Sequence, residues 1–329
     1  MIDILLKTFK GKSALSFLFV ILQQIRHKVK LLHIDRCPLC GEKRFEKRMT
    51  CMDHYATGES FDLFGCVSCG FLFTQDVPVE SEMGRYYATP AYISHSDTHK
   101  GIVNRVYHGV RRYMLSRKAA LVRRSSGKSQ GRLLDIGTGT GYFPHFMQEQ
   151  GWTVTAVEKS EQARAFAGTH FGLKADSPEA LAQYADASFD VITLWHVLEH
   201  LEHLNDTWDT LRRLLTEEGT LVIAVPNHCS YDAVRYGSFW AAYDVPRHLW
   251  HFDAGTMRAF AHKHGFRVKE IHPMPFDAFY VSMLSEKYLK HAFPFMGGLM
   301  TGAQAWMAAL HDKLKSSSLI YVLKKEEAV

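Results

Sequence analysis

The sequence lacks any apolar run long enough to cross a bilayer. The most apolar stretch near the N-terminus, residues 13–22, has about ten residues, half of the roughly 20 that a membrane-spanning helix needs. The residues after it, Gln-Gln-Ile-Arg-His-Lys, contain no small-residue cleavage site of a secretory signal. We therefore expect a cytoplasmic protein. Residues 1–32 have the pattern of an amphipathic basic helix, which leaves open a peripheral contact at the inner face of the membrane.

Low-complexity tracts and internal repeats are also absent. With 47% apolar and 22% charged residues, the composition is that of an ordinary globular protein, and 329 residues suffice for a large α/β core and an accessory module. Basic residues cluster: residues 1–50 carry 11 Lys and Arg against 4 Asp and Glu, and residues 101–125 carry seven Lys and Arg and no acid. Such segments suit phosphate-bearing partners, whether RNA, anionic lipid or a nucleotide-linked sugar, and equally suit solvated helix faces.

Cysteine is scarce, and its placement is specific. Of six cysteines, four form two C-x-x-C pairs separated by 25 residues: Cys37, Cys40, Cys66 and Cys69. This spacing predicts a tetrahedral site for structural zinc, and the glycine after each pair permits a turn that directs backbone N–H groups at sulfur. Iron, paired disulfides or free thiols are the alternatives. Residues 33–76 should thus form a small zinc-ribbon-like module stabilised by its metal. We expect Cys51 and Cys229 in the core.

The most informative stretch is GRLLDIGTGTGYF at residues 131–143. An apolar run without helical period is followed by three glycines at alternate positions, which predicts a buried strand, a tight turn and a helix that starts near Tyr142. Glycines take positive φ and allow a ligand to approach the backbone, so the stretch predicts a nucleotide-cofactor loop. The dinucleotide fingerprint G-x-G-x-x-G does not fit, because its third glycine position holds Tyr142 or Pro144.

The form that does fit is D-x-G-x-G-x-G, in which Asp135 closes the strand. In this the chain resembles the class I S-adenosylmethionine (SAM)-dependent methyltransferases, and especially bacterial ones with N-terminal zinc motifs. The resemblance implies an α/β fold over residues 129–329, with a Rossmann-like seven-stranded sheet and helices on both faces. It also implies SAM as cofactor, held by Asp135, Gly137, Thr138, Gly139, Gly141, Glu158, Asp176, Trp195 and Tyr87.

Three of these residues have expected roles of their own. Glu158 follows the predicted strand 152–157, and a carboxylate there can accept hydrogen bonds from both ribose hydroxyls of the cofactor. Asp176 lies in a weak third strand and is expected near the adenine. Tyr87 and Tyr92 belong to residues 77–128, which are expected to form a lid and a connecting helix; plain packing is the alternative for both tyrosines.

A second signature, FDVITLWHVLEHL, spans residues 189–201. It predicts a fourth strand, and ligands bind beyond the carboxyl ends of strands in open α/β sheets. We expect an acid/base cluster there, with His200 as the first candidate base, then His196 and His248, and with Glu199 orienting one of them. The alternatives are a second metal bound by His196, His200 and His203, or histidines that pack behind the site or in the core.

A third loop, DVPRHLWHF at residues 244–252, adds His248 and His251 as catalytic candidates; histidines that tie this loop to the sheet are the alternative. Asn205 and Asp253 are expected to cap the helices that follow them. The remaining predicted elements are strands at residues 217–225, 266–271 and 318–323, and an inserted helical pair at about residues 283–314. This pair can serve as a substrate cover, a dimer contact or a membrane-facing patch.

The resemblance thus implies a methyltransferase that acts on a small or lipid-linked polar acceptor, such as a sugar in polysaccharide or natural-product biosynthesis. The first alternative is RNA methylation, with the zinc module and the basic helix as recognition elements. Against it, the basic helix lacks the interleaved exposed aromatics that stack on bases. The second alternative is a SAM-binding protein without catalysis.

Overall fold

The computed structural model describes residues 30–87, 102–274 and 276–326. Most of the helix expected at residues 1–32, as well as Tyr92, therefore lies outside the described residues. Leu31 and Leu32, the last residues of that expected helix, form strand β1 (Leu31–Leu32) instead. Within the described part of the chain, no helix combines the length and the apolarity that crossing a membrane requires.

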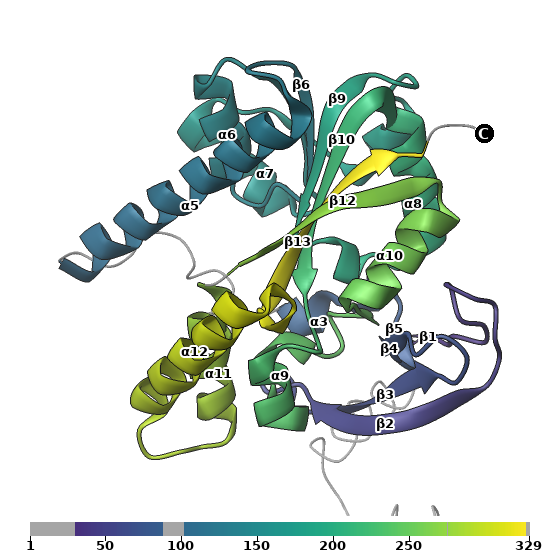
Figure 1. The fold of residues 1–329 in the computed structure, drawn as a ribbon, viewed down its shortest axis with the longest axis vertical. Helices are drawn as coiled ribbons and strands as arrows, with labels where there is room; N and C mark the ends of the chain where they lie inside the picture. Colours follow the sequence, from purple (N-terminus) through teal and green to yellow (C-terminus); the bar gives the residue numbers. More distant parts are fainter. Residues whose placement is uncertain (1–29, 88–101, 275, 327–329) are drawn as a thin grey trace, which may run out of the picture.

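A seven-stranded sheet lies at the centre of the molecule (Figure 1), with the strand order β12-β13-β10-β9-β6-β7-β8. Strand β13 runs antiparallel to both neighbours, and the pairs from β10 to β8 are parallel. The expected Rossmann-like α/β class is thereby confirmed. The strands are β6 (Arg132–Ile136), β7 (Thr153–Val157), β8 (Ala175–Asp176), β9 (Phe189–Trp195), β10 (Leu215–Pro226), β12 (Phe266–Pro273) and β13 (Ser318–Lys325).

Helices cover both faces of this sheet. Side chains alternate along each strand, so Leu133 and Val191 pack under α5 and α6, whereas Leu134 and Ile192 face α8 and α10. Strand β6 pairs with β7 on one side and with β9 on the other, which makes its carboxyl end the point where the strand order reverses. The helices are α5 (Ile102–Ser126), α6 (Tyr142–Glu149), α7 (Glu161–Phe171), α8 (Leu204–Leu214) and α10 (Ala254–Lys263).

The two predicted helix caps differ in outcome. Asp253 caps α10 as expected, in a capping box with Thr256. Asn205 does not cap α8, because that helix begins at Leu204. The amide oxygen of Asn205 instead accepts a hydrogen bond from Lys263 of α10 at 3.0 Å, so this side chain links two neighbouring helices.

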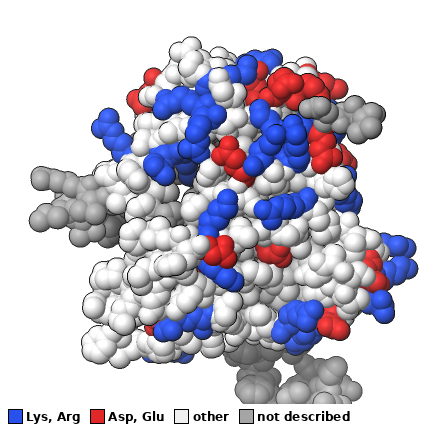
Figure 2. Space-filling model, in the orientation of Figure 1, with Lys and Arg blue, Asp and Glu red and all other residues white. Residues whose placement is uncertain are grey.

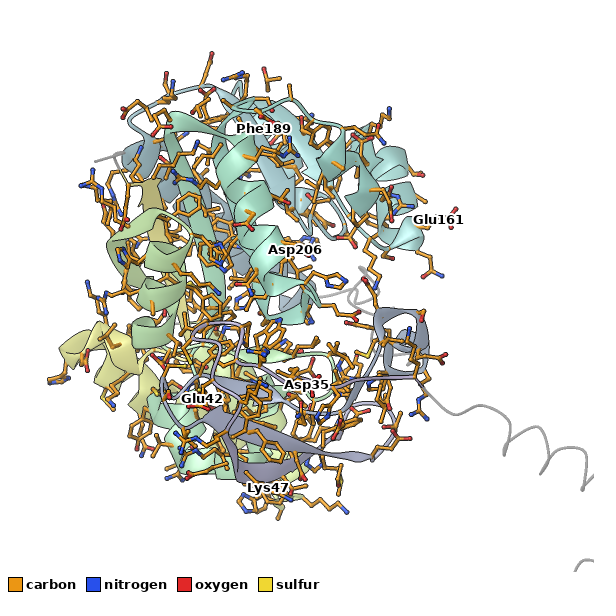
Figure 3. All side chains as sticks on the ribbon, turned by 90° about the vertical axis from the view of Figure 1, so that its right-hand side faces the viewer. Asp35, Glu42, Lys47, Glu161, Phe189 and Asp206 are labelled. Atoms are coloured by element: carbon orange, nitrogen blue, oxygen red, sulfur yellow. The ribbon has the colours of Figure 1, made fainter. Side chains whose placement is uncertain are left out.

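The cysteine-bearing module lies at one end of the sheet domain; in Figure 3 its residues Glu42 and Lys47 are far from Phe189 of the large sheet. It contains β2 (Phe45–Met52), β3 (Ser60–Cys66), β4 (Leu72–Thr74) and β5 (Val77–Pro78), the last paired with β1. Strand β11 (Trp250–His251), which comes from the expected loop at residues 244–252, completes a four-stranded sheet in the order β11-β4-β3-β2. The module is therefore joined to the large domain by backbone pairing.

The inserted helical pair begins earlier than expected and consists of α11 (Asp277–Tyr288) and α12 (Pro294–His311). The two helices approach closely, because a Cβ at Gly298 would lie 2.5 Å from Cα of Met283. Few charged side chains cover this region in Figure 2, where Figure 1 places α11 and α12 at the lower left. Ten large apolar side chains are exposed in the two helices and the residues before them: Phe276, Tyr280, Phe293, Phe295, Met296, Leu299, Met300, Trp306, Met307 and Leu310.

Candidate active site

The glycine loop between β6 and α6 has the backbone that its sequence predicts. Gly137, Gly139 and Gly141 have φ of 72°, 56° and 88°. A Cβ at Gly137 would lie 2.3 Å from Cγ2 of Val197, whereas a Cβ at Gly139 would meet no atom within 4 Å. Packing thus requires glycine at position 137, and the open side of Gly139 leaves room for a ligand against the backbone.

Asp135, the carboxylate just before this loop, holds the loop in place through hydrogen bonds. Its carboxylate is 2% exposed and accepts hydrogen bonds from the hydroxyls of Thr138, at 2.7 Å, and Thr193, at 2.5 Å. Burial raises the pKa of Asp135 to about 6, and these hydrogen bonds hold it below what burial alone would cause. Thr138 therefore supports the loop from within, next to the buried carboxylate.

The two acidic residues expected at the cofactor lie at the ends of neighbouring strands. Oε2 of Glu158 accepts a hydrogen bond from the backbone N–H of Gly139 at 2.7 Å, and its Oε1 accepts one from Ser160 at 2.8 Å. Asp176 accepts a hydrogen bond from the Tyr184 hydroxyl at 2.8 Å. Glu158 is thus in direct contact with the glycine loop, and Asp176 is one strand further along the sheet.

Trp195 and Tyr87 have different surroundings. The Trp195 ring lies at the end of β9, with Nζ of Lys118 4.3 Å from its centroid and the Phe143 ring 5.4 Å away. Lys118 was not a candidate in the sequence, because it is one of seven cations in the same helix. Tyr87 ends α3 (Gly84–Tyr87) and packs against an apolar cluster of the module and α9 (Tyr231–Tyr236), so its contact with a cofactor stays a prediction.

His196 occupies the first position after β9 and has a positive φ of 57°. Its Nε2 lies 3.1 Å from a carboxylate oxygen of Asp277, and its Nδ1 lies 3.4 Å from Oε1 of Glu199. Burial opposes the charged form, but these two carboxylates outweigh it and raise the pKa of His196 to about 10. His196 is therefore protonated at neutral pH and cannot accept another proton.

His200 and His248 form the other part of the cluster, with ring centroids 4.5 Å apart. Nδ1 of His200 lies 3.0 Å from the carbonyl oxygen of Arg247, and Nδ1 of His248 lies 2.8 Å from that of Ala242. A carbonyl oxygen only accepts hydrogen bonds, so each Nδ1 carries a proton and each neutral ring keeps its lone pair on Nε2. Burial, followed by the nearby His248, lowers the pKa of His200 to about 4.

Glu199 lies between these histidines and is fully buried. Among the described residues neither of its carboxylate oxygens has a hydrogen-bond partner. Burial favours the protonated acid, but the neighbouring histidines, His196 foremost, outweigh it and lower the pKa of Glu199. One ligand atom each of Glu199, His200 and His248 lie within 4.8 Å of one another.

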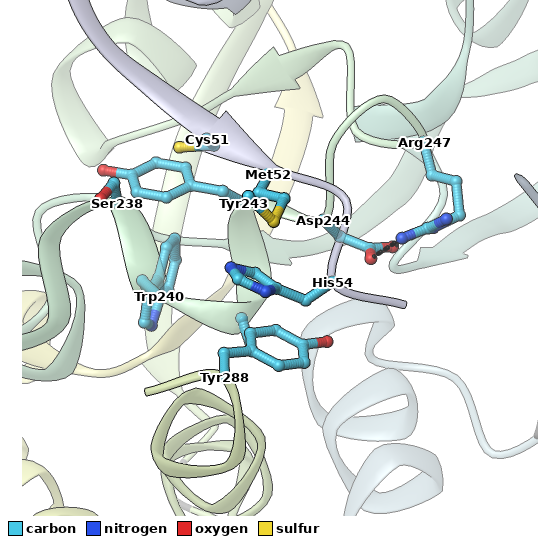
Figure 4. A pocket seen from close by; sticks show the side chains of 10 residues that line it. Cys51, Met52, His54, Ser238, Trp240, Tyr243, Asp244, Arg247 and Tyr288 are labelled. Carbon is cyan, nitrogen blue, oxygen red and sulfur yellow. Dashed lines mark hydrogen bonds and ion pairs between the residues drawn. The ribbon is translucent and has the colours of Figure 1, made fainter. Parts of the chain in front are cut away.

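Arg247 holds the loop that carries His248. Its guanidinium is 3% exposed and donates to both oxygens of Asp244, to Asp53 of the module at 3.0 Å and to the carbonyl of Tyr86 at 2.8 Å. Figure 4 shows Arg247 meeting Asp244, and the ring of His54 lying against Tyr288 in the same interface. Of these three hydrogen-bond partners of Arg247, only Asp244 belongs to the DVPRHLWHF loop, so the other two contacts could not be expected from that loop.

His251 is not part of this cluster. It belongs to β11, and its Nε2 lies 2.9 Å from the Thr74 hydroxyl of the module. Burial lowers its pKa well below the ordinary value, so the ring is neutral. The residues expected to form an active-side loop therefore divide, with His248 in the histidine cluster and His251 in the contact between module and domain.

The four module cysteines converge as expected. Their Sγ atoms lie within 4.8 Å of one another, and the pairs Cys37–Cys69 and Cys40–Cys66 are each separated by 3.5 Å. Zn–S bonds of about 2.3 Å in a tetrahedron place sulfur atoms about 3.8 Å apart, so the arrangement fits zinc. Gly41 and Gly70 have φ of 78° and 75°, as the expected turns require.

Backbone N–H groups also point at sulfur. Burial disfavours the thiolate of Cys66, but the N–H groups of Cys69 and Ser68 outweigh it and lower the pKa of this thiol. Of the two remaining cysteines, Cys51 is buried as expected, whereas the prediction for Cys229 was wrong, because its side chain is exposed. Cys229 follows strand β10 and lies beside His228, where the chain leaves the sheet.

Residues 108–271, about half of the chain, match the family described as "Methyltransferase domain". These residues form a class I SAM-dependent methyltransferase domain. It is 34% identical over 103 residues to a ubiquinone biosynthesis O-methyltransferase of Caulobacter sp. (strain K31), a match that covers 29% of this chain and 41% of the relative. It is 30% identical over 97 residues to an uncharacterized methyltransferase of Staphylococcus carnosus (strain TM300), covering 29% and 47%. The chain thus spans less than half the length of these relatives.

Solved structures of similar fold include two methyltransferases with bound S-adenosylhomocysteine. One is geranyl diphosphate C-methyltransferase from Streptomyces coelicolor A3(2), with 11% identity, a TM-score of 0.47, and coverage of 70% of this chain and 88% of that one. The other is 1,6-didemethyltoxoflavin-N1-methyltransferase from Burkholderia thailandensis, with 15% identity, a TM-score of 0.44, and coverage of 79% and 98%.

Proposed function

We propose that the protein transfers the methyl group of SAM to a hydroxyl oxygen of a small or lipid-linked polar acceptor. The observation that carries the proposal is the contact between the two signatures, in which Gly137 of the cofactor loop lies against Val197 of the segment that bears the histidine cluster. The curated relatives named for ubiquinone O-methylation support oxygen as the methylated atom.

The cofactor fits the glycine loop. Gly139 has open space where a Cβ would stand. Glu158 accepts a hydrogen bond from the backbone N–H of Gly139, and its oxygens can also accept hydrogen bonds from ribose hydroxyls. Bound there, SAM supplies a methyl group on a sulfonium that is its own leaving group. Asp135 and Thr138 keep the loop in this shape, and Trp195 and Asp176 border the site on the neighbouring strands.

The protein's part in the transfer is to orient the acceptor and to receive its proton. With SAM bound, the acceptor oxygen would take the methyl group while the electron pair of the carbon–sulfur bond passed to sulfur, and the hydroxyl proton would have to be received by the protein or by water. His196 cannot take this proton because it already carries one. The first candidate to receive the proton is Nε2 of His200, and the second is Nε2 of His248, because both atoms keep a lone pair.

We also propose structural zinc at Cys37, Cys40, Cys66 and Cys69. Four protein thiolates leave no open coordination position, which is typical of structural and not of catalytic zinc. The ion then stabilises a module whose sheet includes β11, and β11 directly follows His248 and Leu249. Zinc thereby supports the position of the histidine cluster from outside the large sheet.

The test is transfer of labelled methyl from SAM into a cell extract that is afterwards separated into RNA, protein, lipid and small-molecule fractions. The proposal predicts label in the lipid or small-molecule fraction, and no label with the variant Glu158→Ala. Label in RNA would overturn the proposal and would make the zinc module and the basic helix α5 the recognition elements. A protein that binds SAM and labels no fraction would be a binding protein without catalysis.

A further inference from the structure

Glu199, His200 and His248 bring three potential metal ligands close together, with one ligand atom of each within 4.8 Å of the others. Glu199 is fully buried, and neither of its oxygens has a hydrogen-bond partner in residues 30–87, 102–274 and 276–326. Its one close charged neighbour is His196, whose Nδ1 lies 3.4 Å from Oε1. Buried polar groups are almost always hydrogen-bonded, so a carboxylate without a hydrogen bond has room for a ligand. The Nε2 atoms of His200 and His248 carry lone pairs, because both Nδ1 atoms donate to backbone carbonyls.

We propose that Glu199, His200 and His248 bind a divalent transition-metal cation, with zinc as the best fit. One carboxylate oxygen and two imidazole nitrogens form a ligand set that holds zinc in catalytic sites and leaves a fourth position open. The three ligand atoms already lie within 4.8 Å of one another. The site is separate from the four-cysteine site, which has thiolate ligands only.

The hydrogen bonds behind the two histidines have the pattern of metal ligands. A ligating histidine almost always donates its other N–H to a carboxylate or a backbone carbonyl, which fixes the tautomer and the ring orientation. His200 does so to Arg247 at 3.0 Å, and His248 to Ala242 at 2.8 Å. Arg247 is itself held by Asp53 and Asp244, so these contacts position both rings before a cation arrives.

The charges around the cluster also favour a cation. Carboxylates outnumber positive groups even when His196 is protonated: His196 lies between Glu199 and Asp277, and Lys118 is the further cation that acts on Asp277. Arg247 balances one of Asp53 and Asp244, and Nε2 of His248 lies 3.9 Å from Asp244. Two imidazole rings beside this negative charge are a favourable site for a divalent ion.

A single proton would not account for the same observations. A proton on Nε2 of His200 would provide one donor, but three potential ligand atoms lie together here, and Nε2 of His248 would still have only Asp244, at 3.9 Å, as a charged neighbour. A cation would be bound by all three side chains at once. In that state His200 is a ligand and not the direct proton acceptor.

The inference rests on the proposed methyl transfer for its purpose. An acceptor hydroxyl at the open position would lose its proton more readily to water, because a bound cation lowers the pKa of an oxygen ligand. The oxygen would then attack the methyl carbon, and the electron pair of the carbon–sulfur bond would pass to sulfur. The acceptor class that fits is a hydroxyl compound able to offer oxygen to the cation.

Direct measurement of cation binding tests the site. Protein that contains zinc in its four-cysteine site is titrated with Zn²⁺ by calorimetry and, in parallel, with Co²⁺, whose visible spectrum differs between nitrogen–oxygen and thiolate ligands. The variants are Glu199→Gln and His200→Gln. His203→Gln is the matched control, because His203 is an exposed histidine of the same segment. SAM binding and the melting temperature of each variant report whether it is folded.

The expected result is one cation per chain beyond the zinc of the four-cysteine site, with a cobalt spectrum free of thiolate charge transfer. Loss of one ligand weakens binding by at least about 100-fold in both variants and not in His203→Gln. Should Glu199→Gln fail to fold, the comparison stands on His200→Gln. A wild type that takes up no further cation, or variants that bind it equally well, overturns the inference.

The same preparation separates this inference from the proposed function. Suppose that the protein shows no second cation site and that methyl transfer to a small molecule is unchanged after the added cation is removed by gel filtration. That result overturns the cation site alone. A protein that binds the cation and SAM but transfers no methyl group overturns the proposed function and keeps the site.

Discussion

Gly137 of the cofactor loop and Val197 of the histidine segment are in direct contact: a Cβ added at Gly137 would lie 2.3 Å from Cγ2 and 3.1 Å from Cγ1 of Val197. The two residues are 60 positions apart, but β6 and β9 are adjacent in the sheet, with Ile136 opposite Leu194. The shape of the cofactor loop and the position of the histidine cluster therefore depend on each other.

This contact predicts a paired effect of two substitutions. Gly137→Ala should destabilise the protein by about 2–4 kcal/mol, because it combines an overlap with Val197 and a positive φ of 72°. Val197→Ala removes both overlapping methyl groups and should restore part of the loss in the double variant. Urea unfolding of the four proteins measures the coupling; effects that add within about 0.5 kcal/mol would show that the contact is not the cause.

Glu158 provides a prediction for cofactor affinity. Glu158→Gln keeps the size of the side chain but replaces a charged acceptor of hydrogen bonds, so SAM should bind about 10–100-fold more weakly, as expected for hydrogen bonds to a charged group. Glu161→Gln in the first turn of α7 is the matched control, since its side chain is exposed. Calorimetry with SAM gives both affinities, and equal weakening in the two variants would remove Glu158 from the site.

The zinc site predicts a loss of metal together with a loss of stability. Cys66→Ser should release the zinc of the four-cysteine site and destabilise the module, whereas Cys229→Ser should change neither, because Cys229 is exposed and outside the cluster. Metal analysis of the purified proteins and limited proteolysis between residues 33 and 76 make the comparison. Zinc retained at the same stoichiometry in Cys66→Ser would contradict the site.

His228 predicts how stability depends on pH. Burial opposes its charge, but Asp253, 3.4 Å away, and Cys229 outweigh this and raise the pKa to about 9, above the ordinary 6.5. A raised histidine pKa stabilises the fold fully below pH 6.5, and the contribution is lost as pH rises through about 9. At its upper limit this amounts to about 3 kcal/mol.

The measurement compares unfolding of the wild type, His228→Gln and the exposed control His203→Gln. The difference in free energy of unfolding between the wild type and His228→Gln should be largest near about pH 6 and should shrink towards about pH 10. His203→Gln should differ little from the wild type throughout. A difference for His228→Gln that is constant with pH would mean that His228 stabilises only by packing.

Local signals made much of the fold and the cofactor loop predictable. The strand, turn and helix around residues 131–143 follow from an apolar run and three glycines, and Asp253 caps α10 as its sequence predicts. The four cysteines also converge as their spacing requires, because two short turns fix each pair. In these cases the residues that determine the structure lie next to one another in the chain.

The partners within the site were not predictable in this way. Asp277 of helix α11 helps to raise the pKa of His196, and Asp53 of the module forms an ion pair with Arg247, which lies almost 200 positions further along the chain. Neither carboxylate belongs to a recurring pattern. Strand β11 has only two residues, so its pairing with β4 depends on the docked module and not on local propensity. For the same reason His251 was expected in the catalytic loop although it lies in the module contact.

The most direct measurement for the account is the chemical form of the transferred methyl group. The protein is incubated with SAM labelled with ¹³C at the methyl carbon and a small-molecule and lipid extract, and the product is examined by NMR. The account predicts a labelled methyl resonance typical of a methoxyl group on a small or lipid-linked molecule, absent with Glu158→Gln at limiting SAM. A resonance typical of N-methyl or C-methyl groups, or label only in RNA, would contradict it.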